Sequence, residues 1–158
     1  MALPFNELIQ VVFITLLPYL ELRGSIPYAI LYLKWNPIEA FLVAVITNIL
    51  LILPAFFFLD LFFKFFEKIS FAKKGLEKIH KKSHDLIEKY GFLGLMLFVA
   101  VPLPGTGAYA GSLAAYLLDI PRKKAFIAIS LGVIIAGILV LLATLSANSL
   151  LSIFLAKV

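Results

Sequence analysis

Two ionisable side chains stand between apolar segments near the N-terminal end of this 158-residue chain. Glu21 and Arg23 follow the apolar stretch Phe5–Leu20. An ionisable group at membrane depth costs from about 2.5 to more than 10 kcal/mol, so it persists where it faces protein, water or a partner charge. Glu21 is therefore a candidate proton carrier and Arg23 a candidate anchor for an anion. The alternative is a shallow position from which both side chains extend to the membrane surface.

Glycine followed by a hydroxyl residue occurs at two related places, Gly24-Ser25 and Gly105-Thr106. We expect Ser25 and Thr106 to cap the helical arms that follow them, because a hydroxyl oxygen accepts a hydrogen bond from an N–H group that a helix leaves unpaired. Helix N-termini directed at one region attract carboxylate or phosphate groups, although capping alone explains the same residues. Gly105 and Gly107 allow positive φ at the second tip.

Other polar residues give weaker indications of a binding site. Asn48 lies within an apolar segment and is favoured as an interhelical hydrogen-bond partner over a ligand, whereas Tyr28 and Tyr109 either line a cavity or pack. His80 and His84 have no third ligand nearby, which favours solvated histidines over a metal site. The sequence contains no Cys, nucleophile elbow, P-loop or acidic metal cluster, so we expect neither an enzyme nor a cofactor. The predicted substrate- or ion-binding residues are Glu21, Arg23, Gly24, Ser25, Tyr28, Asn48, Pro104, Gly105, Thr106, Gly107 and Tyr109, with no metal ligand.

Apolar helices must position these residues. The chain is 63% hydrophobic and 15% charged, with a mean hydropathy of +1.06, whereas a soluble domain has about a quarter of its residues charged. Ile38–Phe63 and Ala125–Ala147 each exceed the length of about 20 apolar residues that a transmembrane helix needs. The sequence therefore predicts an all-α integral membrane protein, and it excludes nuclear, secreted and ordinary cytosolic proteins.

The segment Gly91–Leu118 cannot be one straight span. Its centre, Val101–Gly107, contains two prolines, which remove backbone donors and crowd the preceding turn. Each arm has eleven residues, or about 16 Å of helix, half of a bilayer core. We expect a re-entrant hairpin that enters and leaves on one face. The basic segments 64–90 and 119–124 then both lie in the cytoplasm, as the positive-inside rule requires, and both termini lie outside.

The N-terminal part resembles this unit. Leu22–Ala29 and Leu103–Ala110 share the pattern Leu-x-Gly-Ser/Thr-x-x-Tyr-Ala at an offset of 81 positions, and each is followed by a proline and a long apolar segment. Glu21–Pro27 is then the first tip. Because i,i+2 residues lie on different faces of a helix, a direct Glu21–Arg23 pair requires this tip to be non-helical. Chance similarity of short apolar segments is the alternative.

These patterns predict two inverted repeats in a single membrane domain, each a re-entrant helical hairpin followed by a transmembrane helix. Inverted repeats with broken helices that meet near the bilayer midplane are typical of transporters. The predicted parts are repeat 1 (1–63), a basic amphipathic connector (64–90), repeat 2 (91–147) and a C-terminal tail (148–158).

Two features concern partners. The amphipathic stripe within 64–90 is suited to an anionic membrane surface or to pairing with a second copy. Small residues recur every four positions over Gly107–Ala115 and Ala128–Ala136, which favours close helix packing and is compatible with a homodimer. Two full spans are few for enclosing a pathway, so we expect a homodimer. A basic patch tethered between apolar segments is not expected to bind nucleic acid.

Two motifs carry a family resemblance. Glu21-x-Arg23-Gly24-Ser25-Ile26-Pro27, together with Pro102-x-Pro104-Gly105-Thr106-Gly107, resembles the putative small multidrug export protein family and, distantly, the DedA/VTT superfamily. The resemblance implies re-entrant hairpins and proton-coupled transport or lipid flipping. It places the acidic and basic positions of the first tip on Glu21 and Arg23. The second tip departs from DedA-type hairpins, which carry Arg beside Pro-Gly.

The leading hypothesis is a multi-pass cell-membrane transporter or flippase, coupled to protons through Glu21. Its anionic or amphiphilic substrate, a lipid phosphate or a drug-like molecule, binds between the two tips with Arg23. One alternative is a membrane scaffold or lipid organiser that transports nothing. Another is an exporter of lipophilic cations that uses Glu21 alone. The expected partners are membrane lipids, the substrate and a second copy of the chain.

Overall fold

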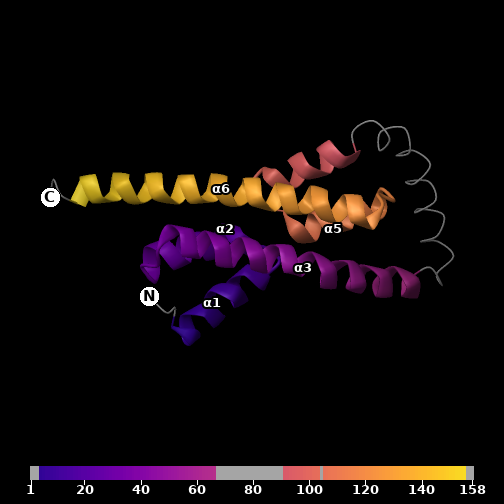
Figure 1. The fold of residues 1–158 in the computed structure, drawn as a ribbon, viewed down its shortest axis with the longest axis horizontal. Coiled ribbons are helices and arrows are strands. Elements are labelled where there is room, and N and C mark those ends of the chain that lie inside the picture. Colours follow the sequence, from indigo (N-terminus) through magenta and orange to yellow (C-terminus); the bar gives the residue numbers. More distant parts are fainter. Residues whose placement is uncertain (1–3, 67–90, 104, 156–158) are drawn as a thin grey trace. The chain divides into compact units, whose positions relative to one another are not determined.

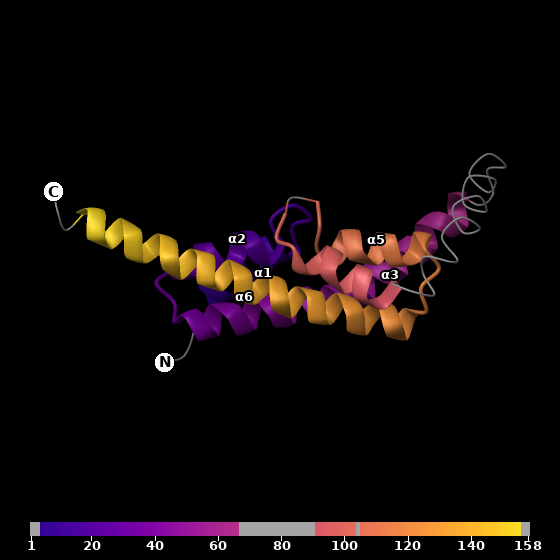
Figure 2. The same cartoon turned by 90° about the horizontal axis from the view of Figure 1, so that it is seen from above.

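A computed structural model describes residues 4–66, 91–103 and 105–155 (Figures 1 and 2). Within these ranges every regular element is a helix, which confirms the predicted all-α class. The chain divides into two compact units, one formed by Met1–Asn48 with Ile134–Val158 and the other by Ile49–Val133. The elements in chain order are α1 (Phe5–Leu16), α2 (Glu21–Pro27), the π-helix η1 (Tyr28–Tyr32), α3 (Pro37–Phe66), a helix over Gly91–Ala100, α5 (Ala108–Leu117) and α6 (Arg122–Leu155).

Two of the described helices are long and apolar enough to cross a membrane. They are Pro37–Lys64 in α3, with a mean hydropathy of 2.6, and Arg122–Ala147 in α6, with a mean hydropathy of 2.9. Large apolar side chains such as Phe57 of α3 and Leu142 of α6 are exposed along them, as expected for helices that face lipid rather than water. Both predicted spans are confirmed as helices, and α6 continues to Leu155, into the segment predicted as a tail.

In the first unit, α1 packs against α2 as an antiparallel hairpin, and η1 continues from α2. Three pairs of polar side chains mark the antiparallel register: Thr15 with Ser25, Gln10 with Tyr28, and Glu7 with Trp35.

The first hairpin turns earlier than the sequence predicted. Its break covers residues 17–20, and Leu17 adopts extended backbone angles of −74° and 128°, because a residue that precedes proline avoids helical angles. The expectation that Glu21–Pro27 forms a non-helical tip is wrong. Pro18 breaks the chain one turn earlier, so Glu21 and Arg23 lie in α2.

In the second unit, the helix Gly91–Ala100 and α5 are separated by a break, as predicted, of which the structure describes residues 101–103 and 105–107. Gly105 and Gly107 have φ of 85° and 130°, angles that L side chains rarely adopt. The small residues next to the break are packing sites, since a Cβ atom added at Gly111 would lie 2.6 Å from Val99 Cγ2. The predicted arms of the second hairpin are therefore helices, and α5 approaches its neighbour closely through a small-residue face.

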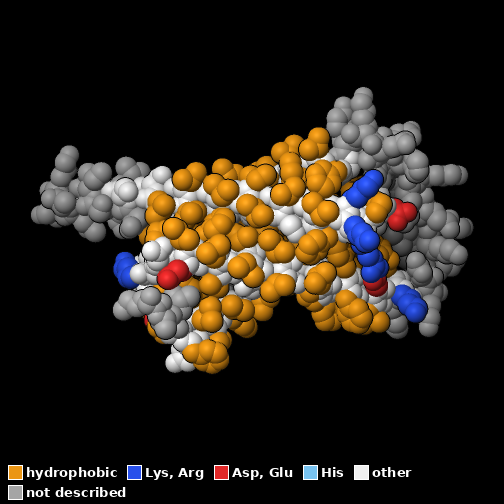
Figure 3. All heavy atoms as spheres, in the orientation of Figure 1, with side chains coloured by type: hydrophobic (Ala, Val, Ile, Leu, Met, Phe, Trp, Pro, Cys, Tyr) orange, Lys and Arg blue, Asp and Glu red, His pale blue; other side chains and the backbone are white. Residues whose placement is uncertain are grey.

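The second unit is charged where α3 ends and α6 begins. Figure 3 shows Lys and Arg side chains gathered there, and the sequence supplies Lys64 and the run Arg122–Lys124. Asp60 accepts hydrogen bonds from Arg122 with both carboxylate oxygens. This ion pair joins two residues that lie 62 positions apart in the chain. The predicted amphipathic connector and its two histidines lie almost wholly outside the described residues.

Candidate functional site

Glu21 is a carboxylate inside an apolar helical unit. It is 2% exposed and is the first residue of α2. Its φ of 44° lies in the left-handed region, which costs an L residue about 1–2 kcal/mol. The backbone N–H of Glu21 donates to Leu17 O at 3.0 Å, which closes the turn before the helix. Burial and an unfavourable backbone angle coincide at this residue, a combination found at functional sites.

Asn48 connects this carboxylate to α3. The side chain of Asn48 is fully buried, and its Nδ2 donates to Glu21 Oε2 across 3.5 Å. The predicted role of Asn48 as an interhelical hydrogen-bond partner is confirmed. Its Oδ1 has no hydrogen-bond partner among the described residues, and a buried unpaired acceptor carries a desolvation cost of about 1–3 kcal/mol. The Glu21–Asn48 pair therefore retains an acceptor that a proton donor or a bound molecule can use.

Arg23 lies two residues after Glu21 in the same short helix. It is partly buried, and its guanidinium interacts favourably with the charge of Glu21. Gly24 follows, at a position where a Cβ atom would lie 2.9 Å from the Leu20 side chain. The first turn of α2 thus carries an acidic and a basic residue two positions apart, next to a residue that must be small.

Ser25 and Thr15 form a buried hydroxyl pair between α1 and α2. Both side chains are fully buried, and Thr15 Oγ1 lies 2.7 Å from Ser25 Oγ and from Val11 O. The predicted N-cap role of Ser25 is wrong. Because the chain breaks at Pro18, Leu20 precedes the first turn of α2 and Ser25 lies inside the helix.

Two further polar contacts join α1 to the segment after α2. Tyr28 Oη donates to Gln10 Oε1 at 2.8 Å, and Trp35 Nε1 donates to Glu7 Oε2 at 2.6 Å. The residues of α1 that make these contacts were missed by the sequence analysis, as was Thr15. The pattern that could have identified them is the occurrence of Glu7, Gln10 and Thr15 on one side of a largely apolar helix.

The second tip is held by its threonine in a different way from the one predicted. Thr106 Oγ1 lies 2.6 Å from Val101 O and 2.9 Å from Leu103 O, so its hydroxyl donates back across the break. The predicted N-cap role of Thr106 is wrong, because Gly107 occupies that position and α5 has no side-chain cap. The positive φ predicted for Gly105 and Gly107 is confirmed. Pro104 lies outside the described residues.

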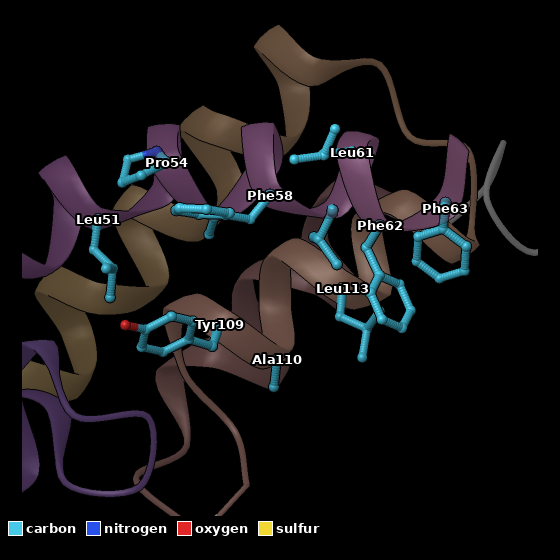
Figure 4. Close-up of a pocket in the computed structure, with 11 residues that line it drawn as sticks. Leu51, Pro54, Phe58, Leu61, Phe62, Phe63, Tyr109, Ala110 and Leu113 are labelled. Carbon is cyan, nitrogen blue, oxygen red and sulfur yellow. The ribbon is translucent and has the colours of Figure 1, made fainter. Parts of the chain in front are cut away.

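Tyr109 lines an apolar groove between α3 and α5. The groove has a volume of about 990 Å³, at the upper end of the range for small-molecule sites. Figure 4 shows Leu51 and Phe58 of α3 on one side of this space and Tyr109 and Leu113 of α5 on the other. Phe63, at the same groove, stacks on Tyr116 with ring centroids 4.5 Å apart. The groove is suited to an apolar or aromatic group.

The predicted site residues thus form two groups, each described within its own unit. Those from Glu21 to Asn48 belong to the first unit, and those from Gly105 to Tyr109 to the second. The approach of the two tips toward each other stays a prediction.

Comparison with known proteins gives one family. A family model described as a putative small multi-drug export protein matches residues 21–139, a range that begins at Glu21 and includes the second tip. No curated protein and no solved structure matches the chain significantly.

Proposed function

We propose, from the premise that this chain belongs to the putative small multi-drug export protein family, that it is a proton-coupled exporter of small amphiphilic molecules. Family membership and two long apolar helices make it a membrane protein. The family's description supplies the process, export of small compounds. The arrangement around Glu21 supports the coupling step.

The buried carboxylate of Glu21 carries this proposal. An ionisable residue inside an apolar membrane protein is expensive, and such residues mark proton and substrate paths. Glu21 is held in place by its backbone turn and by Asn48 Nδ2, so its carboxylate is oriented before any ligand arrives. In the proposed cycle the carboxylate takes up a proton on one side of the membrane and releases it on the other. Arg23 then offers a positive charge to an anionic group whenever Glu21 is protonated.

The re-entrant course of the second hairpin is part of the proposal and has its own support. Asp60, near the end of α3, pairs with Arg122 at the start of α6, within one unit. The chain therefore leaves α3 and enters α6 at the same end. This pairing supports a course in which the segment between them, which includes the helix Gly91–Ala100 and α5, returns to the side from which it started. With basic residues at this end, the positive-inside rule assigns it to the cytoplasm.

Flux in proteoliposomes with an imposed pH gradient tests the proposal. The probes are ethidium as a lipophilic cation and anilinonaphthalene sulfonate as an amphiphilic anion. We expect Glu21→Gln to abolish flux driven by the pH gradient, because glutamine keeps the shape and loses the exchangeable proton. Glu39→Gln, the same chemical change in the first turn of α3, serves as the matched control and keeps wild-type flux. Gradient-driven flux that survives Glu21→Gln would remove the proposed coupling role.

A second candidate function, export of lipophilic cations through Glu21 without Arg23, is favoured by the groove at Tyr109. Phe58, Phe62 and Tyr109 line it, and aromatic faces attract desolvated cations. Arg23→Ala distinguishes the two functions. Loss of anion flux with retained ethidium flux supports the cation exporter, whereas loss of flux for both probes supports a shared site that needs Arg23.

A further inference from the structure

A second groove in the unit Ile49–Val133 lies between α3 and α6 and combines an apolar wall with a charged end. Its volume is about 480 Å³, and it shares no residue with the groove at Tyr109. Leu53 and Phe57 line it from α3, and Ile127 lines it from α6. All three side chains are more than half exposed. An apolar groove that is open to its surroundings is suited to a molecule supplied by the bilayer rather than by water.

The charged end of the groove is formed by Asp60, Arg122 and Lys123. Asp60 and Arg122 neutralise each other through their ion pair. Lys123 is exposed and makes no ion pair within the described part of the chain. The groove therefore carries one uncompensated positive charge, and Lys124 lies next in the chain. A positive charge at this place selects against cationic ligands and attracts anionic ones.

The apolar wall extends from this charge along the helix. Leu53 lies seven residues before Asp60 on α3, which corresponds to about 10 Å of helix. A ligand that satisfies both parts needs an anionic head and an alkyl chain that runs away from it. Inorganic anions lack the chain, and uncharged apolar molecules make no use of Lys123.

We propose that this groove binds an anionic phospholipid, with the phosphate at Lys123 and an acyl chain between α3 and α6. Basic pockets between transmembrane helices on the cytoplasmic side bind anionic head groups in this way. None of its residues belongs to the transport site proposed above. A lipid bound here contacts α3 and α6 together and stabilises the end at which the Asp60–Arg122 pair joins them.

Native mass spectrometry of the full-length protein in detergent tests the site. The probes are dioleoyl phosphatidylglycerol, dioleoyl phosphatidylcholine and short-chain dihexanoyl phosphatidylglycerol. We expect the first lipid to be retained over the other two. Lys123→Gln lowers phosphatidylglycerol occupancy about fivefold, the effect of one basic side chain near an anionic group, and lowers phosphatidylcholine occupancy less, because choline offsets the charge of its phosphate. Ile127→Trp, which fills the apolar wall, lowers the occupancy of both long-chain lipids.

Lys34→Gln is the matched control, since Lys34 is an exposed lysine of the other unit and its loss changes the net charge equally. Equal losses for Lys123→Gln and Lys34→Gln would show unspecific attraction by net charge and overturn the proposal. Unchanged retention in both Lys123→Gln and Ile127→Trp would also overturn it. Circular dichroism and elution volume check that each variant keeps its helices. These experiments measure lipid binding and not transport. A negative result would therefore overturn the lipid site without bearing on the proposed export function.

Discussion

Asp60 and Arg122 form a hydrogen-bonded ion pair although 62 positions separate them in the chain. The pair joins the last turns of α3 to the first turn of α6. In the proposed topology both helices span the bilayer, and this contact then places the end of α3 and the start of α6 on the same side. A chain that leaves one helix and enters the next on the same side cannot cross the membrane an odd number of times in between.

Labelling of single cysteines tests this topology directly, because the chain contains no cysteine of its own. We predict that Lys64→Cys and Lys123→Cys react with a membrane-impermeant maleimide from the same side. Lys34→Cys, which precedes α3, should react from the opposite side. Inside-out and right-side-out vesicles give the two compartments. Finding positions 64 and 123 in different compartments would contradict the re-entrant course of the second hairpin.

The buried pair Glu21 and Asn48 predicts an effect on stability that depends on charge. Asn48→Asp places a second carboxylate about where Nδ2 lies 3.5 Å from Glu21 Oε2. We expect a loss of about 3 kcal/mol, because a buried charge next to a like charge is uncompensated. The double variant Asn48→Asp with Glu21→Gln restores a donor and an acceptor and should recover most of this loss. Thermal unfolding in detergent measures both. A double variant no more stable than Asn48→Asp alone would show that charge is not the cause.

Gly111 predicts a steric effect at the second hairpin. Gly111→Ala places a Cβ atom 2.6 Å from Val99 Cγ2, and overpacking of this kind costs about 1–3 kcal/mol. Gly94→Ala is the matched control, since a Cβ atom there has no neighbour within 4 Å. Val99→Ala removes the clashing methyl group, so Gly111→Ala should cost less in that background. Equal costs in both backgrounds would mean that this contact does not limit the packing of α5.

The hydroxyl pair of the first hairpin predicts a smaller effect. Thr15→Val keeps the shape of the side chain and removes the hydroxyl that lies 2.7 Å from Ser25 Oγ. We expect a loss of about 1 kcal/mol, the net contribution of one hydrogen bond. The double variant Thr15→Val with Ser25→Ala should be less destabilised than the sum of the single variants, because neither hydroxyl is then left unpaired. Strictly additive losses would argue against a direct contact.

Much of the helical framework could be predicted from the sequence because it depends on length and composition. An uninterrupted apolar stretch longer than a bilayer core becomes a helix whatever its detailed order, as α3 and α6 show. The second break was also predictable. Prolines close to this point remove backbone donors, Gly105 and Gly107 permit positive φ, and both effects are local.

The first break was misplaced because two local rules competed. Gly24-Ser25 resembles a helix start, whereas Pro18 restricts the residue before it, and the proline decided the outcome. The positive φ of Glu21 could not be predicted from the sequence, because glutamate has no preference for the left-handed region. Pairings such as Asp60 with Arg122 depend on how distant helices pack, which spacing along the chain does not encode.

The π-helical turn Tyr28–Tyr32 has a consequence for how this hairpin can change over time. Its hydrogen bond from Leu33 N–H to Tyr28 O spans five residues, one more than an α-helix uses. Deleting a single residue there would remove the widened turn and restore the ordinary α-helical pitch, so the residues on either side would keep their faces. The segment is therefore a point at which the hairpin can lose one residue while leaving the buried acid in place.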